Sequence, residues 1–254
     1  MSGAVVRVID LMWERYGEPL SLAELADEAL FSRFYFSRIF RSETGTSPGR
    51  FLTAIRLFRA KNLLLETSLS VTDISYLVGY NSPGTFSSRF TLSVGMPPAR
   101  YRQLAKAGFR VPPRRLIRGG ASSAVEFTAL LPTTGVPSQT YVGVFGTPYP
   151  SMPVACSVFP DSGRYLIPNV PDGDWAIRTV TVATTALDAR PWHRRPLLVS
   201  EPVAIKVRAG SAVPCAWLVP RQPRRTDLPV LLAIPELDSF RVPRWQVERP
   251  ADHG

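Results

Sequence analysis

The sequence predicts α + β architecture in separate domains: an all-α domain first and an all-β antiparallel sandwich second. Three observations lead to this prediction. A pattern of apolar residues at helical spacing occurs twice within residues 1–107, with matching positions 50 residues apart. Short runs rich in Val, Thr, Tyr and Trp, separated by turn residues, fill the region after Gly119. That region also holds 18 of the 25 prolines, which are rare inside helices.

Two domains of ordinary size account for the chain length of 254 residues. We expect a helical domain over residues 1–107, a linker over 108–120 and a β-domain over 121–250. The linker prediction depends on the stretch GFRVPPRRLIRGGASS, which mixes Pro, Gly, Ser and Arg without any periodicity.

Each copy of the repeat begins with a short amphipathic helix. Ser21 precedes Glu24, and Ser70 precedes Asp73, at the spacing of a capping box. In this motif the serine hydroxyl accepts a hydrogen bond from the backbone amide of the acidic residue. The acidic side chain accepts a hydrogen bond from the backbone amide of the serine. A tight turn and a second helix follow in each copy. The sequence therefore predicts a helix-turn-helix that is present twice.

The second helix of each copy begins near Ser32 or Ser82 and ends at Gly45 or Gly95, where we expect a left-handed C′ residue. Three residues later comes a proline, which is favoured in the first turn of a helix. In the first copy the new helix is PGRFLTAIRLFRAKNLLLE, residues 48–66, about 28 Å long at 1.5 Å per residue. Such a rod suits two helices spaced by one DNA turn, roughly 34 Å. It carries Arg50, Arg56, Arg59 and Lys61.

Positive charge is concentrated in the helical part of the chain. The net charge is +10, and residues 1–118 hold 17 Lys and Arg against 9 Asp and Glu. The remaining residues hold 13 against 11. A basic domain with a duplicated helix-turn-helix points to a polyanion as partner, and ordinary solubility charge is the alternative.

The second helix of the first copy has an apolar face and an opposite face without acids. Phe36, Ile39 and Phe40 form the apolar face. Because Arg reads guanine edges and binds phosphates in the major groove, we predict that the opposite face contacts DNA. A merely solvated basic face is the alternative. The candidate contact residues in and next to this copy are Arg33, Phe34, Ser37, Arg38, Arg41 and Arg50.

The corresponding face of the second copy is short and almost uncharged. Its candidate contact residues are Ser82, Gly84, Ser87, Ser88 and Arg89. Short side chains allow close approach to the DNA backbone but distinguish bases poorly. We therefore predict that the first copy dominates sequence reading and that the second mainly positions the protein.

Residues 8–106 resemble the DNA-binding domain of the AraC family, in which a long helix joins two helix-turn-helix units. The resemblance implies a transcription regulator that binds double-stranded promoter DNA, uses no cofactor and has RNA polymerase as a candidate second partner. The matching residues include Ala26, Ser32, Phe36, Ser37, Arg38, Phe40, Gly45, Ser47, Pro48, Phe51, Arg56, Leu57, Ala60, Leu63, Leu64, Val71, Ile74, Gly79, Tyr80, Ser82, Phe86, Ser87, Phe90, Gly95, Pro98, Tyr101 and Arg102.

Three positions depart from the family pattern. Leu30 replaces the usual Gly or Asn of the first turn, which predicts a less tight turn. Ser75 replaces a small Ala, so its hydroxyl requires a partner if it is buried. Ser88 stands where the family often has Arg, which argues against base reading by the second copy.

The β-domain contains seven predicted strands: SAVEFTAL, TYVGVFG, PVACSVF, GRYLIPNV, DWAIRTVTVAT, EPVAIKV and AVPCAWLV. Residues 163–182 alternate around a PDGD turn, which predicts a hairpin. Their Gly-x-Tyr, Asn-Val and Gly-x-Trp pattern resembles the carboxypeptidase-regulatory or transthyretin-like sandwich. Its aromatic residues are either core residues or the lining of a pocket for a small-molecule effector; they are Tyr141, Phe145, Tyr149, Trp175, Trp192 and Trp217.

No motif predicts catalysis or metal binding. Cys156 and Cys215 are expected in the core, and His193 and His253 have no ligand-like neighbours. The stretch GTSPG fits a nucleophile elbow only by letter, because a helix precedes it, and Ser47 is expected to be an N-cap.

Two further functions remain open beside the transcription regulator. An enzyme in the sandwich is one, and a DNA-tethered interaction protein or ligand-binding module is the other. Without a run of roughly 18 apolar residues or a signal peptide, we expect a cytoplasmic protein without membrane contact.

Overall fold

The computed structural model describes residues 3–107, 123–146, 153–159, 162–183, 196–208 and 215–231. The chain divides into two compact units, which are described separately. The helical unit comprises residues 1–109 together with 224–233, and the β unit comprises residues 110–223 together with 234–254. The expected domain boundaries had assigned residues 224–233 to the β-domain. The expected linker, residues 108–120, lies outside the described residues.

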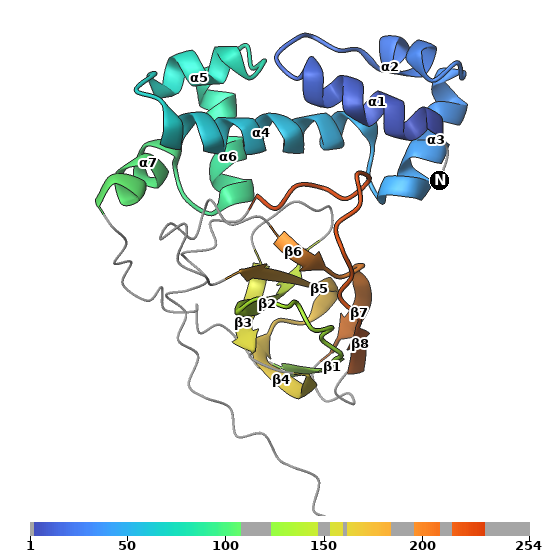
Figure 1. Ribbon diagram of the computed structural model, residues 1–254, viewed down its shortest axis with the longest axis vertical. Helices are drawn as coiled ribbons and strands as arrows, with labels where there is room; N and C mark the ends of the chain where they lie inside the picture. Colours follow the sequence, from blue (N-terminus) through green and yellow to red (C-terminus); the bar gives the residue numbers. More distant parts are fainter. Residues whose placement is uncertain are drawn as a thin grey trace, which may run out of the picture. The chain divides into compact units, whose positions relative to one another are not determined.

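Figure 1 shows the helices of the helical unit arranged around one long central helix, α4. The first lobe consists of α1, α2 and α3, and the second lobe consists of α5, α6 and α7. The predicted helix over residues 48–66 is confirmed at both ends. The bounds are α1 (Gly3–Glu14), α2 (Leu22–Glu28), α3 (Arg33–Thr44), α4 (Pro48–Glu66), α5 (Val71–Leu77), α6 (Pro83–Val94) and α7 (Pro98–Ala107).

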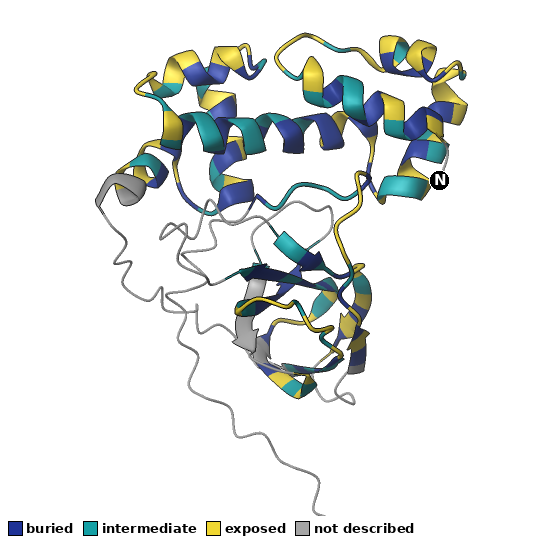
Figure 2. Ribbon diagram, viewed as in Figure 1, coloured by how far each residue is buried: buried dark blue, intermediate teal, exposed yellow. Residues whose placement is uncertain are grey.

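The sequence repeat is a repeat of core packing. In the first lobe the rings of Phe36 and Phe40 have centroids 5.5 Å apart, and Phe40 meets Phe51 of α4 at 5.5 Å. In the second lobe Phe86 and Phe90 are 5.6 Å apart, and Phe90 meets Tyr101 at 5.8 Å. All six rings are buried. Figure 2 shows buried residues along α4 and in the helices around it. Each lobe therefore closes on a chain of three aromatic rings, which explains why the spacing recurs.

The predicted helix ends are confirmed. Both capping boxes form, at Ser21 with Glu24 and at Ser70 with Asp73. The hydroxyls of Ser32 and Ser82 accept hydrogen bonds from the amides of residues 35 and 85. At the other ends of α3 and α6, the glycines 45 and 95 have left-handed φ angles of 74° and 101°. Ser47 occupies the N-cap position of α4 without a side-chain cap bond.

The prediction that Leu30 loosens the first turn is wrong. Leu30 has a φ angle of 58°, in the same left-handed region as Gly79 at 83°. The amide of Phe31 bonds to the Ala26 carbonyl at 3.0 Å, and the amide of Tyr80 makes the matching bond at 2.9 Å. The two turns thus have the same backbone pattern, and Leu30 adopts a conformation that costs roughly 1–2 kcal/mol.

Ser75 has the partner that its burial requires. The residue is fully buried in α5, and its hydroxyl donates to the Thr72 carbonyl at 2.7 Å. That bond confirms the expectation for this departure from the family pattern.

The described residues of the β unit form two sheets. Strands β4, β1 and β8 form one sheet in that order, and the other sheet has the order β3-β2-β5-β6, with β7 also paired to β5. Buried residues of both sheets pack into one shared cluster that includes Phe127, Val144 and Ile177. The bounds are β1 (Ser123–Ala129), β2 (Ser138–Phe145), β3 (Pro153–Phe159), β4 (Gly163–Val170), β5 (Gly173–Ala183), β6 (Pro196–Val199), β7 (Val203–Val207) and β8 (Cys215–Leu218).

Three details of the β unit differ from the predictions. The hairpin over residues 163–182 is wrong, because β4 and β5 belong to different sheets. The expectation of a purely antiparallel domain is wrong as well, because β1 and β8 pair in parallel. Strand β6 was not predicted at all. Local alternation indicates which residues face the core, but it carries little information on which strand pairs with which.

None of the described helices combines the length and hydrophobicity needed to cross a bilayer. Trp192, His193 and His253 fall outside the described residues, as does Tyr149. The expectations for these residues are therefore untested.

Candidate nucleic-acid interface

Helix α3 presents the predicted contact face to solvent. Its buried residues are Phe36 and Phe40, which anchor the helix to the first lobe. Phe34, Arg38 and Arg41 are exposed, and Ser37 is half-buried. The four residues share one side of the helix, because residues 34, 37, 38 and 41 have the spacing i, i+3, i+4 and i+7. Arg33, at the first position of α3, is also exposed. The structure therefore places four of the five candidates of this copy on one side of α3, and Arg33 is exposed in the first turn beside them.

Phe34 is an unusual surface residue. Its side chain is 81% exposed at the second position of α3, although a phenyl ring gains about 1.5–3 kcal/mol from complete burial. Nearby, the guanidinium of Arg38 lies 5.4 Å from the ring centroid of Tyr35, a cation–π contact at an exposed site. The face thus offers one apolar contact group and two cations, with a third cation, Arg33, in the first turn, and it contains no acid.

Helix α6 presents a different surface at the equivalent place. Ser82, Gly84, Ser88 and Arg89 are exposed, and Ser87 is half-buried. Arg89 is the one charged group among these five. The difference between the two helices that the sequence predicted therefore remains when exposure is taken into account.

Arg50 differs from the other cations of α4. It is exposed near the start of the helix. Arg59 instead lies over the rings of Trp13 and Tyr16, at 5.2 Å and 5.3 Å from their centroids, and Lys61 is buried. The later cations of α4 thus lie partly or fully inside the helical unit, which the sequence alone did not reveal.

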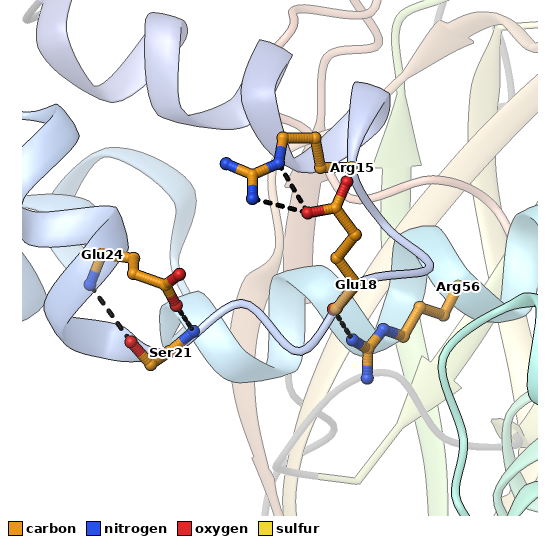
Figure 3. Close-up of polar contacts among 5 residues, drawn as sticks. All are labelled: Arg15, Glu18, Ser21, Glu24 and Arg56. Carbon is orange, nitrogen blue, oxygen red and sulfur yellow. Dashed lines mark hydrogen bonds and ion pairs between the residues drawn. The ribbon is translucent and has the colours of Figure 1, made fainter.

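Arg56 fastens the loop between α1 and α2 to the central helix. Its Nε donates to the Tyr16 carbonyl at 2.7 Å. Its Nη2 donates to the Glu18 carbonyl at 2.6 Å, and Figure 3 shows this second bond. Half-burial lowers the pKa of Arg56 from its usual value, but the group remains charged. Its importance for the site was missed at the sequence level, because nothing local distinguishes it from a solvated arginine.

Side-chain contacts order the same loop. Arg15 forms an ion pair with Glu18, and the hydrogen bond from Arg15 lowers the pKa of that carboxyl (Figure 3). Glu24 accepts from the Ser21 amide at 2.7 Å, and this bond lowers the pKa of Glu24. Both pairs are exposed, so their contribution is to hold the loop in one path more than to stabilise the whole unit.

The two lobes also meet directly. A Cβ atom on Gly17, in the loop of the first lobe, would lie 2.7 Å from the Leu77 carbonyl oxygen of the second lobe. A Cβ atom on Gly79 would lie 2.9 Å from both the Arg56 guanidinium and the Gly17 carbonyl oxygen. These close approaches, together with α4, fix the placement of α3 relative to α6 within the helical unit.

Comparisons with known proteins agree with this geometry. A family model described as a helix-turn-helix domain matches residues 25–104. The lactose operon transcription activator of Staphylococcus xylosus is 31% identical over 98 residues, which make up 39% of this chain and 35% of that protein. The transcriptional activator RhaS of Yersinia pestis is 32% identical over 100 residues, 39% of this chain and 37% of that protein.

A solved structure also resembles the helical unit. It is the DNA-binding domain of the transcriptional factor AdpA in complex with a target DNA, at 32% identity and a TM-score of 0.40, covering 41% of this chain and 93% of that one.

Residues 25–104 are therefore similar to the helix-turn-helix domains of transcription regulators. The chain spans about a third of the length of the curated relatives it matches. The match lies within the helical unit and includes none of the β unit.

Proposed function

We propose that this protein is a sequence-specific transcription regulator that binds promoter DNA by placing α3 and α6 in consecutive major grooves. The observation that carries the proposal is the exposed, acid-free face of α3 on a domain that contains the same fold twice. A rigid helix between the lobes, with the lobes also in mutual contact, suits two grooves on one side of a duplex.

In this proposal the two helices have unequal roles. Arg38 and Arg41 bind guanine edges or phosphates, and Phe34 meets the methyl group of a thymine. Helix α6 offers hydroxyls and one arginine, which suits contacts with the DNA backbone. Arg33 and Arg50 add phosphate contacts at the flanks of the first lobe.

The β unit has a regulatory role in this proposal. The shared core of its two sheets supports a sandwich, and a small-molecule effector or a contact with RNA polymerase would give the regulator its input or output. The relatives are named as transcription regulators, which favours such a role over catalysis.

Selection of binding sites from random DNA by the full-length protein tests the function. We expect a consensus with two parts centred about 10 base pairs apart, one helical turn. The stronger part should belong to α3. Recovery of sequences without any consensus would instead favour a protein that binds DNA generically and acts through its β unit.

Paired substitutions test the unequal roles. Arg38→Ala should weaken binding to the selected site by about 1–3 kcal/mol, because it removes a base or phosphate contact of α3. Ser88→Ala, on the corresponding face of α6, should cost clearly less. A binding titration of both variants on selected and scrambled DNA gives the comparison, and equal losses would contradict the asymmetry.

A further inference from the structure

Residues 224–231, here called the strap, belong to the helical unit although they follow the β unit in sequence. The strap begins with a turn in which the Asp227 carboxylate accepts from the Arg224 amide at 2.7 Å. The Asp227 amide donates in turn to the Arg224 carbonyl at 3.0 Å. Three residues earlier, Arg221 exchanges two backbone hydrogen bonds with Val199 of β6. The chain therefore changes from one unit to the other within a few residues.

The first part of the strap contacts the first lobe. Arg225 forms an ion pair with Asp10 of α1, 215 residues away in sequence. Leu228 packs against the apolar core of that lobe, which includes Ile9 of α1 and Leu52 of α4. Thr226 is buried as well. These contacts attach the start of the strap to α1 and to the core of the first lobe.

The end of the strap reaches toward the second lobe through Lys61. This residue lies in the last third of α4 and is 5% exposed, and its Nζ donates to the Val230 carbonyl at 3.4 Å. The same ammonium lies 5.9 Å from the centroid of the Tyr101 ring in α7. Tyr101 is the last ring of the second lobe's aromatic chain. Leu231, at the end of the described strap, is 1% exposed.

We propose that the strap is a positioning brace of the DNA-binding domain: it joins the core of the first lobe to the aromatic chain of the second and so fixes the spacing of α3 and α6. Figure 1 shows this segment running along α4. With the strap in place, Ser37 and Ser87 are half-buried and the other candidate DNA-contact residues are exposed, so that the brace does not block the proposed interface. The effect on DNA depends on the proposed function, whereas the docking of the strap does not.

Docking can be measured without DNA from the acylation of lysines by an amine-reactive ester, followed by mass spectrometry of the full-length protein. Lys61 should react at least about tenfold more slowly than the exposed Lys206, because reaction requires local opening. The double substitution Leu228→Asp and Leu231→Asp should abolish most of that protection. Val219→Asp, at an exposed position of the β unit, is the control and should leave it unchanged.

A milder set of variants covers the case in which the double substitution prevents folding. Arg225→Asp should raise the Lys61 reaction rate by about 1.5- to 5-fold, the range expected for one exposed ion pair. Adding Asp10→Arg should restore the slow rate by re-forming the pair with reversed charges. Reaction of Lys61 as fast as Lys206 in the unaltered protein, or no response to any strap substitution, would overturn the proposed docking.

The consequence for spacing is measured on the selected DNA site. In the unaltered protein, one or two base pairs inserted between the half-sites should lower affinity about tenfold or more, because α3 and α6 are held at a fixed distance. In the strap variants this penalty should become smaller, because α4 and the contacts at Gly17 and Gly79 then hold the spacing without the strap. An unchanged penalty in a variant with reactive Lys61 would refute the brace, whereas absence of any selected site would refute the proposed function and leave the docking result standing.

Discussion

At the scale of single residues, the turns of the two helix-turn-helix copies have the same backbone conformation but different residues. Both turn residues need a left-handed backbone, with φ angles of 58° at Leu30 and 83° at Gly79. Space decides which residue each turn can accept. Leu30 projects into solvent and is 85% exposed, whereas a Cβ atom on Gly79 would collide with Arg56 and with the Gly17 carbonyl. The first turn therefore tolerates a side chain at the cost of strain, and the second does not.

This difference predicts opposite effects of substitution on stability. Leu30→Gly should raise the free energy of unfolding by up to about 1 kcal/mol, because released strain of roughly 1–2 kcal/mol exceeds the entropy cost of glycine. Gly79→Ala should lower it by about 2–4 kcal/mol, through backbone strain together with overpacking. Urea unfolding of the full-length protein measures both.

Gly45→Ala is the matched control for this pair. Gly45 also has a left-handed φ angle, 74°, but a Cβ atom there would meet nothing within 4 Å. The cost should then be strain alone, roughly 1–2 kcal/mol. A loss as large as that of Gly79→Ala would show that the contact with Arg56 is irrelevant.

At the scale of secondary-structure elements, the helices of the two lobes begin with serines that do different work. Ser21 accepts from the amide of Glu24 at 3.2 Å and completes a capping box, whereas the Ser47 side chain makes no cap bond. A proline at the first helical position does not explain this difference, because Ser82 also precedes a proline and still accepts from the Thr85 amide. The side chain of an N-cap serine thus matters only where an amide depends on it.

Serine-to-alanine substitutions should separate these two situations. Ser21→Ala should lower the free energy of unfolding by about 1 kcal/mol, through the loss of a bond to an otherwise free amide. Ser47→Ala should change it by less than about 0.5 kcal/mol. Thermal or urea unfolding followed by helical circular dichroism provides the test, and similar losses in both variants would contradict the assignment of the caps.

The success of the sequence-based predictions follows the range of the interactions involved. Capping boxes, left-handed glycines and the bounds of α4 depend on residues within one or two turns, and these features were predicted. Strand pairing depends on residues far apart in sequence. The separation of β4 from β5 and the parallel pairing of β8 were not predicted for that reason.

The candidate contact residues of α3 were predictable from helical periodicity, because their exposure follows from the buried Phe36 and Phe40. Arg56 was beyond such reasoning. Its partners are backbone carbonyls at Tyr16 and Glu18, some 40 residues earlier in the chain. Sequence patterns identify a helix face, but they do not identify what a long side chain reaches.

At the scale of the whole molecule, the surroundings of Lys61 show that the chain returns to its first domain after the β unit. Burial lowers the pKa of this ammonium from 10.5 to about 7. Groups around it come from two distant parts of the chain, namely the Val230 carbonyl of the strap and the Tyr101 ring of α7. The helical unit therefore buries Lys61 at a site whose surroundings include residue 230, which belongs to the strap and follows the β unit in sequence.

The shifted pKa makes stability depend on pH in a definite direction. Between pH 7 and 10.5 the unfolded chain keeps a proton on Lys61 that the folded protein has released, so that stability rises with pH across this window. As pH falls toward 7 the contribution is lost, because the folded protein must then hold a buried charge. Lys61→Met removes the titration while keeping an apolar chain of similar length.

We therefore expect the stability of the Lys61→Met variant, relative to the unaltered protein, to be highest near pH 7 and lowest near pH 9.5. The difference in their free energies of unfolding, measured by urea unfolding with circular dichroism at several pH values, should move steadily in favour of the unaltered protein as pH rises. Tyr80 and Tyr101 stay protonated in the folded protein over this range, because burial raises their pKa values above the usual 10. A pH-independent difference would mean that Lys61 keeps an ordinary pKa, and that the strap leaves it open to water.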